Sequence, residues 1–261
     1  MSPGSSLGVQ VGILARRSIA KTLRQPFQLF PVLFFPAMLL AVNASGLAAA
    51  TRIPGFPTDS YITFALAVAF MQGALFSLIN TGTNVAADIE TGFLNRLALT
   101  PLRRVSLLGG LLAGVAVLGA LQSLAYVGMG LVGGAHIAAG VLGVVVIVVL
   151  GMLVAVAFGA LGVFAAVRTG SGEAVQGLFP LFFVLLFLSS SNLPRNLIKT
   201  GWFHTVADWN PISYILEGFR SLLIDGWQAT PLLRGFGMTL VLGAAALALA
   251  AAGLRGRMER T

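Results

Sequence analysis

The sequence predicts an all-α integral membrane protein with six membrane-spanning helices. Two observations of composition point there: 57% of the 261 residues are hydrophobic and only 9% are charged, against roughly 25% charged in an ordinary soluble domain. A soluble fold of this size could not shield so much apolar surface from water, whereas a bilayer accepts it. The third observation is that the apolar residues gather in six long runs along a single transmembrane domain, 1–261.

Each predicted span is about as long as, or longer than, the stretch of about 20 residues that crosses the hydrocarbon core. The spans are expected at 29–50, 61–85, 105–133, 138–167, 174–191 and 235–254. The fourth exceeds one perpendicular crossing, so it should tilt or project into the cytosol. The fifth is short and contains Pro180, and the first contains Pro31 and Pro36. Proline in a spanning helix frees backbone groups, which neighbouring parts of the protein must then satisfy.

Lysine and arginine set the expected orientation. With the amino terminus placed inside, 11 of the 16 Lys and Arg residues fall on inner segments and 5 on outer ones, as the positive-inside rule requires. Both termini are therefore expected in the cytoplasm, with no cleaved signal peptide. The basic excess is expected to face anionic membrane lipid. Nucleic-acid binding is not expected, because no nucleic-acid-binding motif is present.

Three segments are expected outside the simple spans. Residues 12–28 mix apolar and basic residues at helical spacing, which predicts an amphipathic helix in the membrane interface. Its basic residues are Arg16, Arg17, Lys21 and Arg24. The second segment is the inner loop 86–104, and the third is the outer segment 192–230.

The outer segment predicts two short helices. Asn210 and Pro211 make a good helix start, with Asn as the N-cap and Pro at the first helical position. One apolar face follows, made of Ile212, Ile215, Leu216, Phe219, Leu222 and Leu223. Ser213, Glu217, Arg220, Ser221 and Asp225 fall on other faces. Trp202 to Trp209 suggest the second, shorter amphipathic helix. The pair is expected to dip into the outer leaflet and return, and the alternative is a surface hairpin outside the membrane.

We expect no catalytic, cofactor or metal site in this chain. His136 and His204 both fall in predicted outer loops, and no metal-ligand spacing or cysteine occurs. The more polar span residues are Gln72, Asn80, Asn84, Gln122 and Tyr126. They either line a path or bond helix to helix. Without acidic groups at membrane depth a secondary transporter is disfavoured, and without a GxxxxGK[ST] phosphate loop any ATP must be hydrolysed by another polypeptide.

The inner loop carries a specific order of residues. It contains Asp88, Glu90, Gly92, Leu94, Leu97, Thr100, Pro101 and Arg104. The two acids are expected near a helix start, where the helix dipole favours them. Leu94 and Leu97 would give a short apolar face, and Thr100 and Pro101 would end that helix. Taken alone, this loop also fits a solvated segment with a topology anchor.

This loop resembles the coupling-helix region of the type-2 ABC exporter permeases, the membrane subunits of ATP-driven exporters. Their pattern is roughly E-x-x-x-G-x-L-x-x-L-x-x-T-P-x-x-R. Glu90 is displaced from it, and the positions from Gly92 to Arg104 fit. Many members have an acid where Asn95 or Arg96 stands here, so a salt bridge to the ATPase cannot be carried over from that position.

Two further motifs share this resemblance. The outer residues Asn210, Pro211, Glu217 and Arg220, with Tyr214 between them, fit the family's N-P-x-x-x-x-x-[DE]-x-x-R signature before the last span. The basic amphipathic helix and the Pro-containing segment after it resemble the family's opening. The nearest subgroup is the daunorubicin-resistance-like permeases of antibiotic exporters.

The resemblance implies a bacterial cytoplasmic-membrane permease, not itself an enzyme. It would work with two soluble ATPase subunits, which bind ATP and Mg²⁺, and with a second permease, identical or homologous. The amphipathic helix and the inner loop would dock on the ATPases, and the outer helices would cap the path. The expected cargo is hydrophobic or amphipathic and drug-like or antibiotic-like, although the sequence does not identify the residues of its path.

Other functions remain open at this stage. The same architecture could export a lipid or a lipid-linked glycan. A membrane-embedded enzyme is disfavoured because no catalytic constellation is present. A passive channel is disfavoured because rings of charge and polar stripes are missing.

Overall fold

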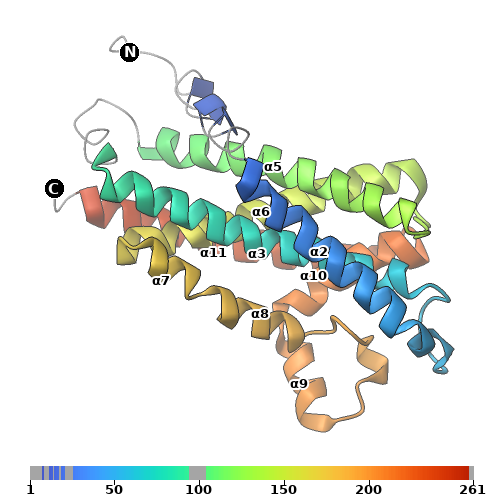
Figure 1. Cartoon of the computed structure of the whole chain (residues 1–261). Helices are drawn as coiled ribbons and strands as arrows, with labels where there is room; N and C mark the ends of the chain where they lie inside the picture. The colour runs from blue at the N-terminus through green and yellow to red at the C-terminus, as the bar shows by residue number, and fades with distance from the viewer. Residues whose placement is uncertain are drawn as a thin grey trace.

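The computed structural model describes residues 26–93 and 104–258, together with several helical residues between 8 and 20. Five long helices form a bundle in this part of the chain. The first and shortest of them reaches only one end of the molecule, and the other four run between both ends (Figure 1). They are α2 (Pro26–Gly46), α3 (Tyr61–Glu90), α5 (Arg104–Val132), α6 (Gly140–Thr169) and α11 (Ala229–Met258). The inner loop therefore connects α3 to α5, and its residues 94–103 are outside the part of the chain that the structure describes.

Short elements join the long helices. They are the 3-10 turns Ala48–Arg52 and Arg195–Leu197, the helices α7 (Gly172–Gln176), α8 (Phe179–Phe187), α9 (Gly201–Trp209) and α10 (Pro211–Arg220), and the π-turn Ser221–Asp225. Most of these follow the fifth apolar segment and precede α11. The chain is therefore most irregular between its fourth and its last long helix.

Four helices of the described chain are long and apolar enough to cross a membrane. They are Tyr61–Glu90, Ser106–Val132, Gly140–Thr169 and Ala229–Arg257. Two further apolar stretches, Phe30–Gly46 and Gly172–Phe187, are shorter. The helix bounds also differ from the expected spans, since α3 continues beyond residue 85 and α11 begins before residue 235. Helix length and lipid depth are separate quantities, because a helix can project beyond the hydrocarbon.

The fifth apolar segment is broken, where the sequence suggested one span with a proline inside it. Helix α7 ends at Gln176, and α8 begins at Phe179 with Pro180 in its first turn. Proline lacks the N–H that a helix interior requires, and its ring clashes with the carbonyl four residues earlier. That carbonyl belongs to Gln176, so the first helix stops there. Pro180 instead takes a position in the next helix where an N–H is not needed.

Pro36 in α2 is tolerated because a side chain of a neighbouring helix supplies the hydrogen bond that the proline cannot make. Pro36 cannot donate to the carbonyl of Val32, four residues earlier. The hydroxyl of Tyr126 on α5 donates to this same carbonyl at 2.7 Å. Tyr126 therefore joins α5 to α2 by a hydrogen bond. Of the two roles considered for the polar span residues, lining a path or joining helices, this contact is the second. Gln122 lies one turn earlier on α5 and accepts from Ser77 of α3 at 3.5 Å.

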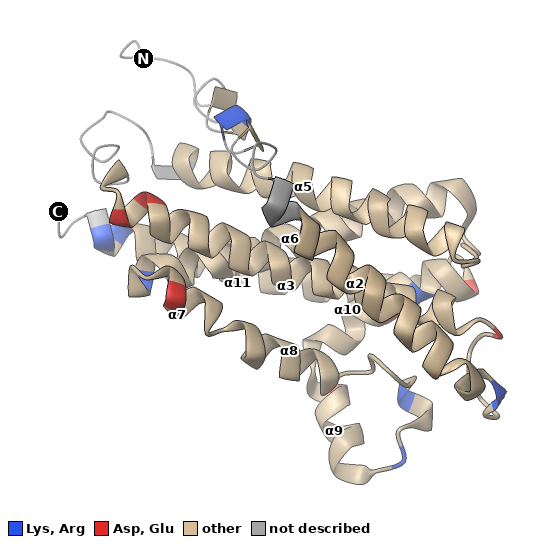
Figure 2. Ribbon diagram, viewed as in Figure 1, with Lys and Arg blue, Asp and Glu red and all other residues tan. Residues whose placement is uncertain are grey.

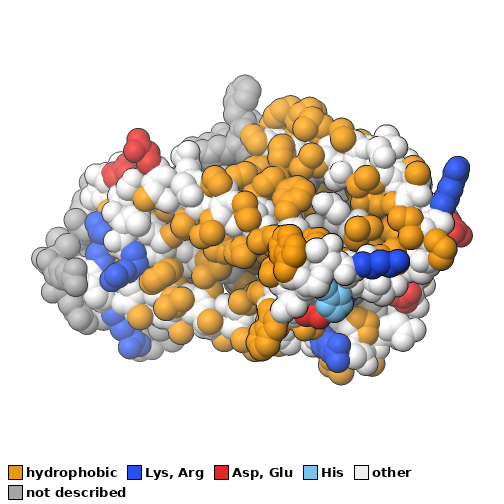
Figure 3. All heavy atoms as spheres, turned by 90° about the horizontal axis from the view of Figure 1, so that it is seen from below, with side chains coloured by type: hydrophobic (Ala, Val, Ile, Leu, Met, Phe, Trp, Pro, Cys, Tyr) orange, Lys and Arg blue, Asp and Glu red, His pale blue; other side chains and the backbone are white. Residues whose placement is uncertain are grey.

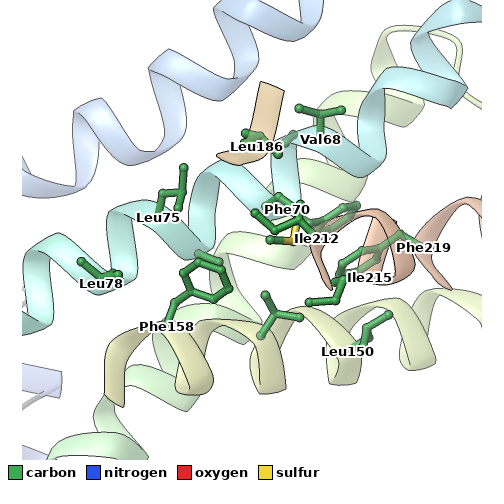
Figure 4. Close-up of a cluster of buried hydrophobic side chains, with 14 of the residues drawn as sticks. Val68, Phe70, Leu75, Leu78, Leu150, Phe158, Leu186, Ile212, Ile215 and Phe219 are labelled. Atoms are coloured by element: carbon green, nitrogen blue, oxygen red, sulfur yellow. The ribbon is translucent and has the colours of Figure 1, made fainter. Parts of the chain in front are cut away.

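Helix α3 is the centre of the bundle. It packs against α2, α5, α6, α7 and α10. Within its most apolar stretch of 18 residues, 83% is buried inside the protein. Figure 4 shows its side chains meeting those of α6 and α10 in the hydrophobic core. Two glycines let α3 and α6 approach closely, since a Cβ added at Gly162 would lie 2.1 Å from the carbonyl oxygen of Leu78. A Cβ added at the opposing glycine, Gly82, would lie 2.9 Å from the carbonyl oxygen of Gly162 and 2.5 Å from Val175.

Among the described residues, the charged ones gather toward the two ends of the bundle and leave its middle uncharged (Figure 2). One end, called the inner end here, carries the C-terminal ends of α3, α6 and α11. The other, called the outer end, carries the start of α3 and the segment around α9. Seen from below, apolar side chains cover much of the surface between the two charged ends (Figure 3). This banding is what a bilayer requires of a spanning protein.

The Tyr126 hydrogen bond predicts that the effects of Tyr126→Phe and Pro36→Ala on the free energy of unfolding are not additive. Tyr126→Phe leaves the Val32 carbonyl without a donor in the protein interior, and we expect the free energy of unfolding to fall by about 1–3 kcal/mol. Pro36→Ala restores a backbone N–H for the same carbonyl, so Tyr126→Phe should cost much less in that background. Thermal unfolding of the four proteins in detergent measures this. An equal cost of Tyr126→Phe in both backgrounds would contradict the bond's assigned role.

Candidate functional site

The outer motif begins with the helix start that the sequence predicts. The Asn210 side-chain oxygen accepts from the backbone N–H of Ile212 at 3.0 Å, and Pro211 is the first residue of α10. The Asn210 amide also donates to the carbonyl of Leu185 in α8 at 2.7 Å. Asn210 therefore caps α10 and at the same time supplies a donor near the end of α8.

The apolar face of α10 is buried inside the bundle. Ile212, Ile215, Leu216 and Phe219 are nearly inaccessible, and Leu222 and Leu223 of the π-turn are as well. Phe219 stacks on Phe70 of α3, with ring centroids 4.6 Å apart and an interplanar angle of 7°. On its other side α10 meets α11, where a Cβ added at Gly235 would lie 2.9 Å from the Cα of Gly218. Helix α10 thus enters the bundle between α3 and α11.

Arg220 lies in the interior, which corrects the expectation that it sits on a face away from the core. Only 6% of the residue is exposed. Its guanidinium donates to the carbonyls of Phe64, Ser190 and Ser191, at 3.2, 2.5 and 2.7 Å. The guanidinium carbon also lies 3.5 Å from the centroid of the Phe64 ring. A planar cation with five N–H donors suits such a ring of acceptors, and periodicity alone cannot reveal that such acceptors exist.

These carbonyls identify what Arg220 does. Ser190 and Ser191 follow α8, beyond the last backbone hydrogen bonds of that helix, which reach the carbonyls of Val184 and Leu186. Both serines are buried, and the backbone N–H of Ser190 is also satisfied, because it donates to Ser213 of α10 at 3.1 Å. Phe64 lies in the first turn of α3. Arg220 therefore joins α10, α3 and the end of the fifth segment through one side chain.

Tyr214 and Glu217 bind the segment that precedes α10. Glu217 forms a two-pronged ion pair with Arg195, and Arg195 also donates to Asp208 at 3.2 Å. The Arg195 guanidinium lies 4.2 Å from the centroid of the Tyr214 ring, and the Tyr214 hydroxyl donates to the Asp208 carbonyl at 2.8 Å.

Arg195 keeps its charge within this cluster. Burial acts to lower the pKa of Arg195, but its interactions with Glu217, Tyr214 and Asp208 outweigh burial, so the pKa is raised. Arg195 thus stays charged at every accessible pH. The sequence does not predict the roles of Arg195 and Asp208, because no periodicity or motif links them to α10.

A groove beside this network has nearly all-apolar walls. Its volume is about 380 Å³, and α6, α8, α9, α10 and α11 line it. Phe158 and Phe182 form its inner wall, and Val206 and Trp209 of α9 form its rim. Trp209 is 85% exposed and Trp202 is 66% exposed, a placement that suits indole rings at a membrane–water interface. The groove therefore offers an apolar ligand a place next to the outer motif.

At the inner end, two predicted site residues lie at the end of a helix, where the sequence predicted the start of one. Asp88 and Glu90 lie in the last turn of α3, not near a helix start. The backbone reason is Gly92, whose φ of +67° is the left-handed conformation that ends helices. Thr91 and Gly92 were the available signal for this end. Asp88, rather than Glu90, stands four residues before that glycine, as the acid in the E-x-x-x-G pattern does.

The amphipathic helix contacts this end of α3. Arg17 lies 3.5 Å from the Asp88 carboxylate, and its guanidinium carbon is 3.8 Å from the centroid of the Phe93 ring. Arg16 is exposed. Arg104 begins α5. The other predicted residues of these two segments, Lys21, Arg24, Leu94, Leu97, Thr100 and Pro101, lie outside the described part of the chain.

The described residues hold no group of three or more side chains suited to bind a metal ion. The geometry is instead that of helices and irregular turns held by carbonyl and ion-pair contacts around apolar surfaces. Residues 9–224 match the ABC-2 type transporter family. The chain belongs to that family. No curated protein matches it.

Membership in the ABC-2 family defines the general role. The matched region contains the inner loop and all five residues of the outer motif. Members are membrane components of ABC transporters, so this chain is an integral membrane protein and a transport permease component rather than a catalyst. Membership also implies association with an ABC ATPase. The contacts of the ABC-2 outer motif hold the permease itself together.

The contacts of Arg220 predict that replacing this buried cation strongly lowers the free energy of unfolding. Arg220→Met leaves three buried carbonyls without this donor, and we expect the free energy of unfolding to fall by at least about 2 kcal/mol. Arg220→Lys should recover only part of this, because an ammonium cannot stack and bridge as a guanidinium does. Thermal unfolding in detergent measures both. Arg52→Met is the matched control at an exposed outer arginine, and an equal effect there would contradict the assignment.

Proposed function

We propose that this chain is the permease half of an ATP-driven bacterial exporter that carries hydrophobic or amphipathic compounds out across the cytoplasmic membrane. The observation that carries the proposal is the ABC-2 family match over residues 9–224. Three motifs, in the amphipathic helix, the inner loop and α10, resemble those of the type-2 ABC exporter permeases, among which the daunorubicin-resistance-like permeases are the nearest subgroup. That resemblance favours drug-like or antibiotic-like cargo.

The proposed topology has six crossings. The four long apolar helices supply four, and α2, with a length of about 31 Å, supplies another. The fifth crossing uses α7 and α8, which together reach about 24 Å, and the turn after them completes it. Irregular backbone at membrane depth is tolerated only where protein buries it. The buried serines and the Arg220 and Asn210 bonds meet that condition.

The inner end is proposed to be cytoplasmic, with both termini on that side. The sequence places 11 basic residues inside and 5 outside. Two of the outer five, Arg195 and Arg220, are engaged with acids and carbonyls inside the protein. The difference in basic charge that lipid headgroups meet is therefore larger than the count of residues suggests.

The apolar groove supports the choice of cargo. Its walls, from Phe158 and Phe182 to Trp209, offer dispersion and burial but almost no polar atoms. A strongly ionic solute would lose its hydration there without compensation, whereas an apolar or amphipathic molecule gains from burial. The groove also adjoins Asn210 and Pro211 at the start of α10, so its shape depends on the outer motif.

The working unit is proposed to contain two permeases, identical or related, and two ATPase subunits that hold ATP and Mg²⁺. The amphipathic helix and the inner loop would form the ATPase contact. The bond from Arg17 to Asp88 and its stacking on Phe93 support this, because they place the helix directly beside the loop. Closure of the ATPases would then move both segments together with α3.

The inner loop provides the test of this function. Leu94 and Leu97 are three residues apart and would share one face of a short helix, inserted into a groove of the ATPase. Replacing both with Asp should abolish ATPase co-purification and ATP-dependent drug export from reconstituted vesicles, because each uncompensated buried charge costs several kcal/mol. Membrane insertion should be unchanged.

The matched control is Leu94→Met with Leu97→Met, which keeps the apolar face and should preserve both activities. Normal export and co-purification by the Asp variant would reject the loop as the coupling element. If the wild-type complex moves a lipid or a lipid-linked glycan in the same vesicles and no drug, the cargo proposal is wrong and the architecture is retained.

Orientation can be tested with single cysteines, because the chain contains none. Thr200→Cys at the outer end and Glu173→Cys at the inner end both occupy exposed positions. In intact cells, an impermeant thiol reagent should label the first and should label the second only after permeabilisation. Labelling of Glu173→Cys but not of Thr200→Cys in intact cells would invert the proposed orientation.

A further inference from the structure

A second cavity lies at the inner end, far from the outer motif. Its volume is about 480 Å³, and the C-terminal parts of α6 and α11 form its walls. Phe164 and Arg168 come from α6, and Leu249, Gly253, Gly256 and Arg257 come from α11. Neither the family assignment nor the proposed ATPase contact accounts for it.

Glycines keep this cavity open. A Cβ added at Gly256 would meet no atom within 4 Å, and one added at Gly253 would only reach ordinary contact with Val167. The close packing that requires glycine elsewhere in the bundle is therefore not the reason for these two residues. Their absent side chains leave room for another molecule between the helix ends.

The described residues that line the cavity include two basic side chains and no acidic one. Arg168 and Arg257 are its two charged residues. Arg168 is exposed and Arg257 half-buried, and Arg257 donates to the carbonyl of Val167 at 3.3 Å. This bond fixes the guanidinium at the cavity wall. The C-terminal dipoles of α6 and α11 disfavour an anion here, so binding of an anion depends on the two guanidinium groups.

The remaining walls are apolar and continue toward the middle of the molecule. Phe164 and Leu249 stand beside the arginines. Leu249 is exposed, and beyond the cavity α11 continues as an apolar helix, of whose most apolar stretch only 22% is buried. The cavity thus joins a cationic rim to a long apolar surface, as the two parts of an anionic amphiphile require. Basic pockets between helices on the cytoplasmic side of a membrane bind anionic headgroups in this way.

We propose that this cavity binds an anionic phospholipid of the inner leaflet. Its phosphate is held between Arg168 and Arg257, and its acyl chains lie over Phe164, Leu249 and the outward face of α11. The leaflet rests on the proposed orientation, whereas the binding site itself does not. Phosphatidylglycerol therefore stabilises the contact between α6 and α11 near the ATPase-facing end.

The test uses the purified full chain in nanodiscs and in detergent. Added phosphatidylglycerol should raise the unfolding temperature and remain bound in native mass spectra, and phosphatidylcholine should do neither. Arg168→Gln with Arg257→Gln should weaken phosphatidylglycerol binding on the order of tenfold or more. Arg255→Gln is the matched control, because this exposed arginine lies on α11 but does not line the cavity. It should bind as the wild type does.

Further arms separate other occupants from the lipid. Gly256→Leu fills the cavity without removing a charge and should also reduce lipid binding, which covers the case that the double variant folds poorly. A shift of equal size with inorganic phosphate would assign a small-anion site and overturn the lipid proposal. Displacement of the lipid by the ATPase would assign the cavity to a protein partner and overturn it as well.

Unchanged phosphatidylglycerol binding by both the double variant and Gly256→Leu also overturns the proposal. None of these readouts measures transport. A chain that binds lipid here but exports nothing would leave the site standing and reject the proposed function. A chain that exports drug without this binding would do the reverse.

Discussion

The fifth apolar segment ends at the outer side with backbone carbonyls that no helix satisfies. Arg220 donates to the carbonyls of Ser190 and Ser191, and Asn210 donates to that of Leu185. Without these donors, the short helix α8 could not end inside a protein core or a bilayer, because unpaired buried carbonyls are costly. The position of α10 between α3 and α11, the ion pairs of Glu217 and the apolar groove all depend on this anchoring.

Helix α3 relates the two ends of the molecule. At its outer end the Phe64 carbonyl accepts from Arg220, and in its last turn Asp88 meets Arg17. Between them runs one continuous helix of 30 residues, about 45 Å long. Its close approach to α6 at Gly82 and Gly162 leaves little room for sliding. In the proposed exporter, a displacement of the inner loop would therefore reach the outer network through a rigid element.

Charge in this protein has three different environments. At the inner end basic residues lie close to the helix ends, and two of them border a cavity with apolar walls. At the outer end Arg195 is paired with Glu217 and Asp208. Arg220 meets carbonyls and an aromatic face without a direct acidic partner. The positive-inside rule counts all of these equally, although only the exposed ones act on the membrane.

The sequence by itself determined the membrane class, the long apolar helices, the buried face of α10 and its Asn210 cap, because each depends on composition or on neighbours within a few residues. It did not determine that α8 is separate from α7 or that α3 continues through Asp88, although Pro180 and Gly92 are local signals for both. Only the tertiary structure decided the burial of Arg220, the partners Arg195 and Asp208, and the meeting of Tyr126 with the carbonyl left free by Pro36. These contacts join residues from 6 to 156 positions apart. Such pairs form where whole helices pack, and packing leaves no periodic trace in the residues that it brings together.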